Sequence, residues 1–234
     1  MGPLRPGKVP GDVIEPWLET APGPEVRRGP AVGEDAALIE LARVRAVVLD
    51  MDGTLMRSRY DWPEIRRRLG ITGRSILDEL EALPEPTRSV RRRELEAVEQ
   101  EATRTARLEP GARELLEAFR RSGLRTALVT NNTEANAREL LERFDLDFDV
   151  VLTRDTGLWK PSAAPLVEAL RRLGVAPARA LAVGDSAFDL EAGRAAGCAL
   201  VAVVNGGHDT LRHLADLSFP DLAGLARCLG VVRP

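Results

Sequence analysis

The amino-acid sequence predicts an α/β fold, a doubly wound parallel sheet with a small α-helical cap insertion. Three observations lead to this prediction. The apolar run over residues 46–49 is typical of a buried parallel strand. After residue 110, strand-like and helix-like stretches alternate with short links, as they do in βαβ units. Between these two parts, residues 57–108 carry helical periodicity that Pro and Gly interrupt.

The composition and the positions of Pro and Gly divide the 234 residues into an N-terminal extension, an α/β core and a cap. Residues 1–40 are rich in Pro and Gly and form the extension. We expect residues 41–56 and 109–234 to form the core, and residues 57–108 to form the helical cap. The elements expected after Pro110 are a helix over 111–122, a strand over 125–130, a helix over 132–144, a strand over 149–152, a helix over 162–173, a strand over 180–183, a helix over 187–196 and a strand over 200–204. Right-handed crossovers would bring the carboxyl ends of these strands to one edge of the sheet.

The overall composition narrows the classes of partner. The formal net charge of −3 argues against nucleic acid, because nucleic-acid-binding domains are usually basic. No apolar run is long enough to span a membrane, and the N-terminus lacks the apolar core of a signal peptide. Cys198 and Cys228 are the only cysteines and lack metal-ligand spacing, so we expect free thiols in a cytoplasmic protein. The oligomeric state stays open.

Asp50 and Asp52 follow the first strand directly. Residues two apart in an extended chain face the same side, so both carboxylates can point into one site. Gly53 then allows a sharp turn. The carboxyl end of a central strand is where open α/β sheets bind ligands. Taken alone, the pattern could also be a strand followed by a polar turn.

Two further polar features follow the next strands along the chain. Thr130 and Asn131 come straight after a strand and open a helix, where a hydroxyl and free N–H groups suit an anionic oxygen. An ordinary helix cap would need only one such residue. Lys160 is, apart from Lys8, the only lysine among 33 basic residues. This bias favours a functional cation over a surface lysine.

A second pair of acids follows the strand over 180–183. Gly184 turns the chain, Asp185 precedes a helix, and Asp189 lies one helical turn later, so the two carboxylates can share a face. Clustered oxygen ligands of this kind suit Mg²⁺, which keeps several waters and borrows substrate oxygens. A capping role would explain Asp185 alone. It would not explain so many acids at one sheet edge, where their repulsion must be neutralised.

In this order, the motifs resemble those of the haloacid dehalogenase-like superfamily over residues 44–205. Asp50-Met51-Asp52-Gly53-Thr54 is similar to its first motif, Thr130 to its second and Lys160-Pro161 to its third. Gly184-Asp185-Ser186-x-x-Asp189 is similar to its fourth. The insertion lies between the first two motifs, as the helical cap does in the phosphoglycolate phosphatase-like branch. The cap of this chain is short for that branch.

The resemblance implies a phosphatase that acts on a small phosphorylated metabolite through an aspartyl-phosphate. It implies that Asp50 is the nucleophile and that Asp52 is the general acid and base. It also implies phosphate binding by Thr130, Asn131, Lys160 and Gly53. The implied Mg²⁺ ligands are the Asp50 carboxylate, the Asp52 carbonyl and Asp185, with Asp189 acting indirectly or through water.

Other activities of the superfamily can be weighed against the residues. A dehalogenase lacks the second acid of the first motif, which is present here as Asp52, and a phosphonatase needs a cap lysine, which residues 57–108 lack. A phosphomutase, whose core residues are the same, remains an alternative. So does a non-catalytic binding module.

Residues 29–39 carry a second resemblance. Their sequence, Gly-Pro-Ala-Val-Gly-Glu-Asp-Ala-Ala-Leu-Ile, is similar to the N-terminal segment of the ATP-binding superfamily of aminoimidazole ribotide synthetase. In that superfamily the acid helps to bind magnesium and ATP. Because nothing downstream continues the resemblance, we expect a fused remnant or a packed tail and not an ATP site.

Overall fold

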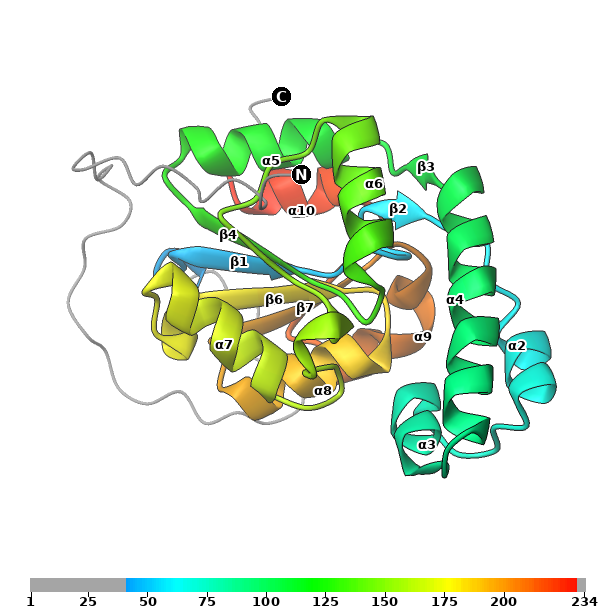
Figure 1. Ribbon diagram of the computed structural model, residues 1–234. Coiled ribbons are helices and arrows are strands. Elements are labelled where there is room, and N and C mark those ends of the chain that lie inside the picture. Colours follow the sequence, from blue (N-terminus) through cyan, green and yellow to red (C-terminus); the bar gives the residue numbers. More distant parts are fainter. Residues whose placement is uncertain (1–40, 231–234) are drawn as a thin grey trace.

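A six-stranded parallel sheet forms the centre of the computed structural model, which describes residues 41–230 (Figure 1). The strands lie in the order β5-β4-β1-β6-β7-β8, and every neighbouring pair is parallel. They are β1 (Ala46–Leu49), β4 (Arg125–Val129), β5 (Val150–Leu152), β6 (Ala180–Gly184), β7 (Leu200–Val204) and β8 (Leu217–Phe219). The predicted doubly wound parallel sheet is confirmed. The resemblance over residues 29–39 lies outside the described residues.

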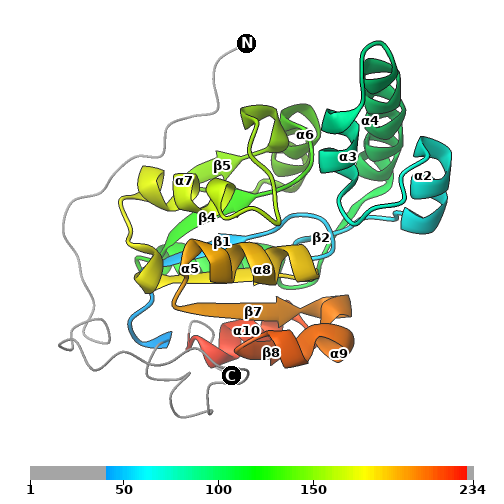
Figure 2. The same ribbon diagram turned by 90° about the horizontal axis from the view of Figure 1, so that it is seen from below.

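Helices cover both faces of the sheet (Figures 1 and 2). Helices α5 (Ala112–Arg121), α6 (Glu134–Phe144) and α10 (Leu222–Cys228) pack on one face, and α7 (Ala164–Leu173) and α8 (Ala187–Ala196) pack on the other. The short α9 (His208–Leu211) follows β7. Because both faces are covered, β1 and β7 are buried along their whole length, which explains their continuous apolar sequence.

Amphipathic spacing determines which helix faces are buried. On α5, Leu115, Leu116 and Phe119 point into the core, as their spacing predicts. Burying such a side chain fully contributes about 1.5–3 kcal/mol. Helix α7 starts later than the helix that we expected over 162–173. The helix begins at Ala164, and Pro165 lies in its first turn, whereas Pro161 precedes the helix and follows a cis peptide bond.

Between β1 and α5, the chain leaves the core and returns to it through a small antiparallel pair, β2 (Met56–Arg57) and β3 (Arg107–Leu108). Three helices lie between them: α2 (Trp62–Leu69), α3 (Ile76–Ala82) and α4 (Thr87–Thr105). We call residues 62–105 the helical insertion. Its helices share a separate apolar cluster, formed by Ile65, Leu69, Ile71, Ile76, Leu80 and Leu95. Figures 1 and 2 show the insertion beside the carboxyl ends of the strands.

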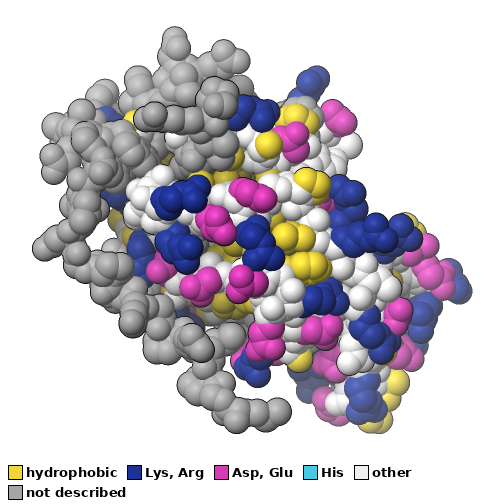
Figure 3. All heavy atoms as spheres, turned by 90° about the horizontal axis from the view of Figure 1, so that it is seen from above, with side chains coloured by type: hydrophobic (Ala, Val, Ile, Leu, Met, Phe, Trp, Pro, Cys, Tyr) yellow, Lys and Arg dark blue, Asp and Glu magenta, His cyan; other side chains and the backbone are white. Residues whose placement is uncertain are grey.

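Acidic and basic side chains are interspersed on the face that Figure 3 shows. Several pair within one helix, such as Glu117 with Arg121 in α5 and Glu134 with Arg138 in α6. Such pairs stabilise a helix by about 0.2–0.5 kcal/mol each. Neither Cys198 nor Cys228 forms a disulfide within residues 41–230, and Cys198 is buried. Over residues 41–230, no helix combines the length and the apolar character that crossing a membrane requires.

Candidate active site

The sheet brings three of the predicted polar stretches to one edge. Strand β1 lies between β4 and β6, with Leu49 in register with Leu128 and Val183. The residues that follow these strands therefore emerge side by side at the carboxyl edge. In this way Asp50, Thr130 and Asp185 come together, although up to 135 positions separate them in sequence.

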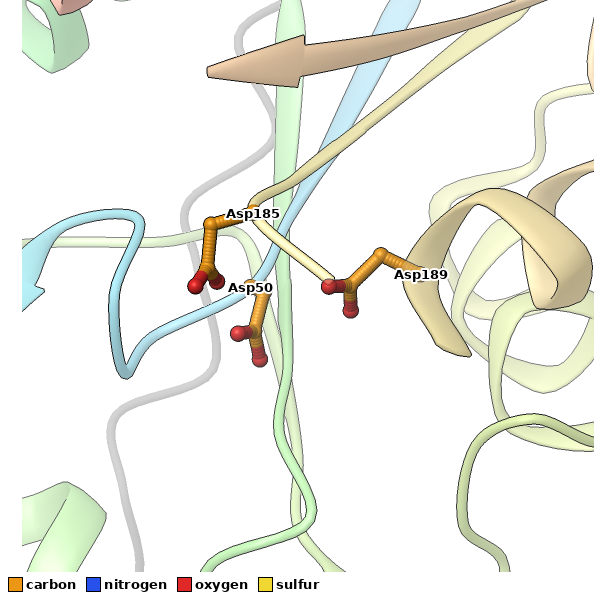
Figure 4. Close-up of side chains that lie close together, drawn as sticks. All are labelled: Asp50, Asp185 and Asp189. Carbon is orange, nitrogen blue, oxygen red and sulfur yellow. The ribbon is translucent and has the colours of Figure 1, made fainter. Parts of the chain in front are cut away.

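Three carboxylates converge at this edge. One carboxylate oxygen each from Asp50, Asp185 and Asp189 lies within 4.8 Å of the others. Figure 4 shows the three side chains pointing toward one another from the ends of β1 and β6 and the first turn of α8. Three acids this close repel one another unless a cation lies among them. An all-oxygen donor set is the chemistry that Mg²⁺ selects, so these residues fit that ion.

Lys160 supplies positive charge to the carboxylate cluster. Its Nζ donates to Asp50 Oδ1 at 2.5 Å and to Asp189 Oδ1 at 2.6 Å, and the residue is only 4% exposed. Burial alone would lower the pKa of Lys160, but the charges of Asp189 and Asp50 outweigh it and raise the pKa. Lys160 is therefore a fixed cation at neutral pH.

Burial also shifts the acids of the cluster. It raises the pKa of Asp50, against the opposing charge of Lys160. It raises the pKa of Asp185 to about 7, with a further contribution from the negative charge of Asp189. Thr54 Oγ1 donates to Asp185 Oδ1 at 3.2 Å. Asp189 Oδ2 accepts hydrogen bonds from the backbone N–H and the hydroxyl of Ser186, so Asp189 also caps the start of α8.

The side chain of Asp52 lies apart from the carboxylate cluster, in a polar network of its own. Its two oxygens accept hydrogen bonds from Ser58 Oγ at 2.5 Å and Asn132 Nδ2 at 3.0 Å. Asn132 Nδ2 also donates to the hydroxyl of Tyr60 at 3.2 Å. Burial raises the pKa of Asp52, and the hydrogen bonds from Ser58 and Asn132 oppose that shift. Asp50 and Asp52 therefore differ in surroundings, although only one residue separates them.

Thr130 and Asn131 support the site in different ways. Thr130 is buried, and its Oγ1 accepts from the backbone N–H of Asn132 at 3.1 Å. The Asn131 side chain bonds the backbone of Lys160 twice, accepting from its N–H and donating to its carbonyl, each at 2.8 Å. This clamp fixes the loop that carries Lys160. Phosphate binding by Thr130 and Asn131 remains a prediction.

Two features favour glycine at position 53: a positive φ angle and the close approach of the Asp185 carboxylate. Its φ is +84°, and a Cβ built there would lie 2.1 Å from Asp185 Oδ2, so the Asp185 carboxylate would have to move out of its place in the site. The backbone N–H of Gly53 donates to the carbonyl of Met56 at 2.7 Å, and phosphate binding by Gly53 remains a prediction. Asn205, after β7, donates to the carbonyls of Gly53 and Thr54 and so fixes the turn.

A cavity of about 430 Å³ opens between this edge and the helical insertion. Its core side includes Asp50, Asp52, Thr130, Asn131, Asn132, Lys160, Asp185, Ser186, Ala187, Phe188 and Asp189. The other side comprises Tyr60 together with residues of the insertion: Trp62, Arg66, Arg74, Ser75, Ile76, Leu77, Leu95 and Glu99. The volume is that of a ligand-binding pocket, for which about 300–1,000 Å³ is usual.

A buried ion pair joins the insertion to the core beside this cavity. Arg154 donates to both carboxylate oxygens of Glu99, at 2.5 and 2.7 Å, and their side chains are only 8% and 7% exposed. Arg154 also donates to the carbonyl of Asn131 at 3.2 Å. Burial raises the pKa of Glu99 to about 7, against the attraction of Arg154.

The sequence correctly predicted which strand ends meet at the site, but several residues of the site were not predicted. Asn205 could have been found, because it follows the strand over 200–204 in the same way that Asp50 follows β1. Ser58, Tyr60, Glu99 and Arg154 carried no such signal. They reach the site from the loop before α2, from α4 and from the short 3₁₀ helix after β5.

In comparison with known protein families, the matching part of the chain contains the residues that line this cavity. The family model that matches residues 44–197 is described as haloacid dehalogenase-like hydrolase. An uncharacterised hydrolase of Saccharomyces cerevisiae is 32% identical over 195 residues, which cover 78% of this chain and 89% of that protein. A phosphoglycolate phosphatase of Nitrosospira multiformis is 32% identical over 212 residues, which cover 76% of this chain and 92% of that protein.

Solved structures show the same architecture. A hydrolase from Pseudomonas syringae superposes with a TM-score of 0.69 at 20% identity, covering 81% of this chain and 100% of that one. A predicted phosphoglycolate phosphatase from Haemophilus somnus gives a TM-score of 0.60 at 23% identity, covering 79% and 97%. At this level of identity the likeness concerns the fold.

Proposed function

The chain belongs to the haloacid dehalogenase-like hydrolase family, and on this premise we propose that it is a Mg²⁺-dependent phosphatase that hydrolyses a small phosphate monoester through an aspartyl-phosphate intermediate. Relatives that are named phosphoglycolate phosphatase support the phosphatase assignment. The observation that carries the proposal is the convergence of Asp50, Lys160 and Asp185 at one sheet edge, where they line the cavity beneath the helical insertion.

In the proposed first step, Asp50 attacks phosphorus. A carboxylate oxygen of Asp50 forms the new bond to phosphorus while the bond from phosphorus to the leaving oxygen breaks. Asp52 gives its proton to that oxygen, so that the alcohol leaves uncharged. The bonds from Ser58 and Asn132 hold the Asp52 carboxyl in place for this transfer. In the second step Asp52 takes a proton from water, which attacks phosphorus and frees Asp50 and inorganic phosphate.

Charge on the phosphoryl oxygens must be balanced while these bonds exchange. Lys160 is the fixed cation for this task, and Thr130 and the backbone of Asn131 are the proposed donors around it. Asp50, the carbonyl of Asp52 and Asp185 would hold Mg²⁺, with Asp189 acting indirectly. When bound, the ion would offset the repulsion between the carboxylates and the phosphoryl group. The helical insertion is the proposed cap that excludes bulk water.

The proposal is tested by release of p-nitrophenol from p-nitrophenyl phosphate with Mg²⁺ present. We expect Asp50→Asn to abolish release while circular dichroism stays unchanged. Asp145→Asn is the matched control, because the Asp145 side chain is 95% exposed on the far end of α6, and it should keep full activity. Equal activity of wild type and Asp50→Asn would disprove the role of Asp50. With a sugar phosphate, free phosphate as the main product would argue against a phosphomutase.

A further inference from the structure

Two stacked aromatic rings line the cavity on the side of the helical insertion. The rings of Tyr60 and Trp62 lie 4.5 Å apart between centroids, with an angle of 18° between their planes. Both residues line the cavity, yet Trp62 is 45% exposed. A tryptophan at the start of a helix that leaves almost half its surface to solvent contributes little to the apolar cluster of the insertion. Its position suits contact with a bound molecule.

The stacked pair begins next to the group that is proposed to protonate the leaving oxygen. Asn132 Nδ2 donates both to Asp52 and to the hydroxyl of Tyr60, so that hydroxyl lies beside the Asp52 carboxyl. In the proposed reaction the leaving oxygen must contact Asp52. The group attached to that oxygen therefore passes along Tyr60 toward Trp62.

Four apolar side chains also line the cavity. They are Ile76 and Leu77 of α3, Leu95 of α4 and Phe188 of α8. Such side chains favour an uncharged leaving group with an apolar surface, since burial of that surface stabilises the complex. A two-carbon acid such as glycolate would leave most of this lining without contact.

Each charged side chain on the insertion side of the cavity already has a partner within the protein. Arg66 donates to the carbonyls of Gly73 and Arg74, and the guanidinium of Arg74 pairs with Glu191. Glu99 pairs with Arg154. A carboxylate on the leaving group would have to compete with these partners for the two arginines, and it would lie near the Glu99 carboxyl group.

We propose that the substrates are phosphate monoesters of an uncharged alcohol that carries a flat, apolar ring, which packs against Tyr60 and Trp62. This inference rests on the proposed function and narrows it to one substrate class. The cavity of about 430 Å³ has room for such a ring together with the phosphoryl group. Trp62 is then a specificity-determining residue that contacts the substrate.

The test compares benzyl phosphate, ethyl phosphate and phosphoglycolate, with Mg²⁺ and release of inorganic phosphate as the readout. All three are esters of primary alcohols, so differences report binding of the leaving group more than its chemical reactivity. We expect kcat/KM for benzyl phosphate to exceed the other two by about tenfold. Trp62→Ala should lower kcat/KM for benzyl phosphate about fivefold and leave ethyl phosphate unchanged. Trp62→Phe, which keeps a ring, should retain most of the preference.

Val90→Ala is the matched control, because Val90 is an exposed apolar residue of the same insertion that does not line the cavity. It should leave all three rates unchanged. Equal kcat/KM for benzyl and ethyl phosphate would overturn the inference. So would a preference for phosphoglycolate that Arg66→Met or Arg74→Met removes, since those arginines would then bind an anionic leaving group. If p-nitrophenyl phosphate is not hydrolysed either, the proposed function itself has failed.

Discussion

Replacing Glu99 by Ala is expected to lower the free energy of unfolding by about 3–5 kcal/mol, because the change leaves a buried guanidinium without its carboxylate. Arg154 is 8% exposed and makes two hydrogen bonds to Glu99. After the substitution, the carbonyl of Asn131 is the one hydrogen-bond acceptor that Arg154 retains among residues 41–230. The loss is a large fraction of the total stability of a domain, which is about 5–15 kcal/mol.

The matched control is Glu101→Ala, two residues further along α4. Glu101 pairs with Arg104 at the surface, where the two side chains are 62% and 59% exposed. Such a pair contributes about 0–1 kcal/mol, and both variants gain the same helix propensity from Ala. Urea unfolding followed by circular dichroism and by tryptophan fluorescence measures both. If Glu99→Ala costs within about 1 kcal/mol of Glu101→Ala, the buried pair does not stabilise the docked insertion.

The pH dependence of the free energy of unfolding provides a second test of the buried Glu99 side chain. Its pKa rises from 4.5 to about 7 on folding. Between these two values the folded protein keeps a proton that the unfolded chain has released, so stability falls as pH rises through this range, by an amount on the order of 3 kcal/mol. The loss is complete above the folded pKa. Glu99→Gln cannot release that proton and should lack this part of the decline between pH 5 and pH 8. Parallel stability curves for wild type and Glu99→Gln would refute the argument.

Three further outcomes are expected. Gly53→Ala should destroy activity, because the new Cβ would overlap the Asp185 carboxylate. Gly174 has a similar positive φ and no atom within 4 Å of a Cβ built there, so Gly174→Ala should cost only about 1–2 kcal/mol of stability. Turnover measures the first effect and thermal melting the second. Lys160→Gln should lower kcat by about a hundredfold or more, and a smaller loss in a folded variant would argue against its role. Dialysis against EDTA should abolish phosphate release and added MgCl₂ should restore it, and activity that survives chelation would exclude an exchangeable metal.

The elements of the core could be predicted because their sequences contain the relevant information locally. The continuous apolar runs of β1 and β7 and the spacing of Leu115, Leu116 and Phe119 define which surfaces are buried. Once the strands are parallel, their carboxyl ends share an edge, and the polar residues that follow them must meet there. The short β8, with only three residues, is less regular in sequence, and it was not predicted.

The contacts between the insertion and the core could not be predicted in the same way. Glu99 lies within a strongly charged stretch of α4, where a charge normally belongs to a solvated helix face. It is buried because Arg154, 55 positions later, forms a bidentate pair with it. Pairing at this distance depends on how the insertion docks, which is a property of the assembled structure. The same holds for Ser58 and Tyr60 around the Asp52 carboxyl.

The position of Lys160 shows how the two kinds of information combine. No strand carries this residue. It lies in the loop between η2 (Arg154–Thr156) and α7, and helix or strand periodicity cannot place a loop side chain. The Asn131 side chain, which follows β4, bonds both the N–H and the carbonyl of Lys160, and Arg154 in turn bonds the carbonyl of Asn131. The cation is thus held by the strand edge through Asn131 and is connected to the insertion through Arg154 and Glu99.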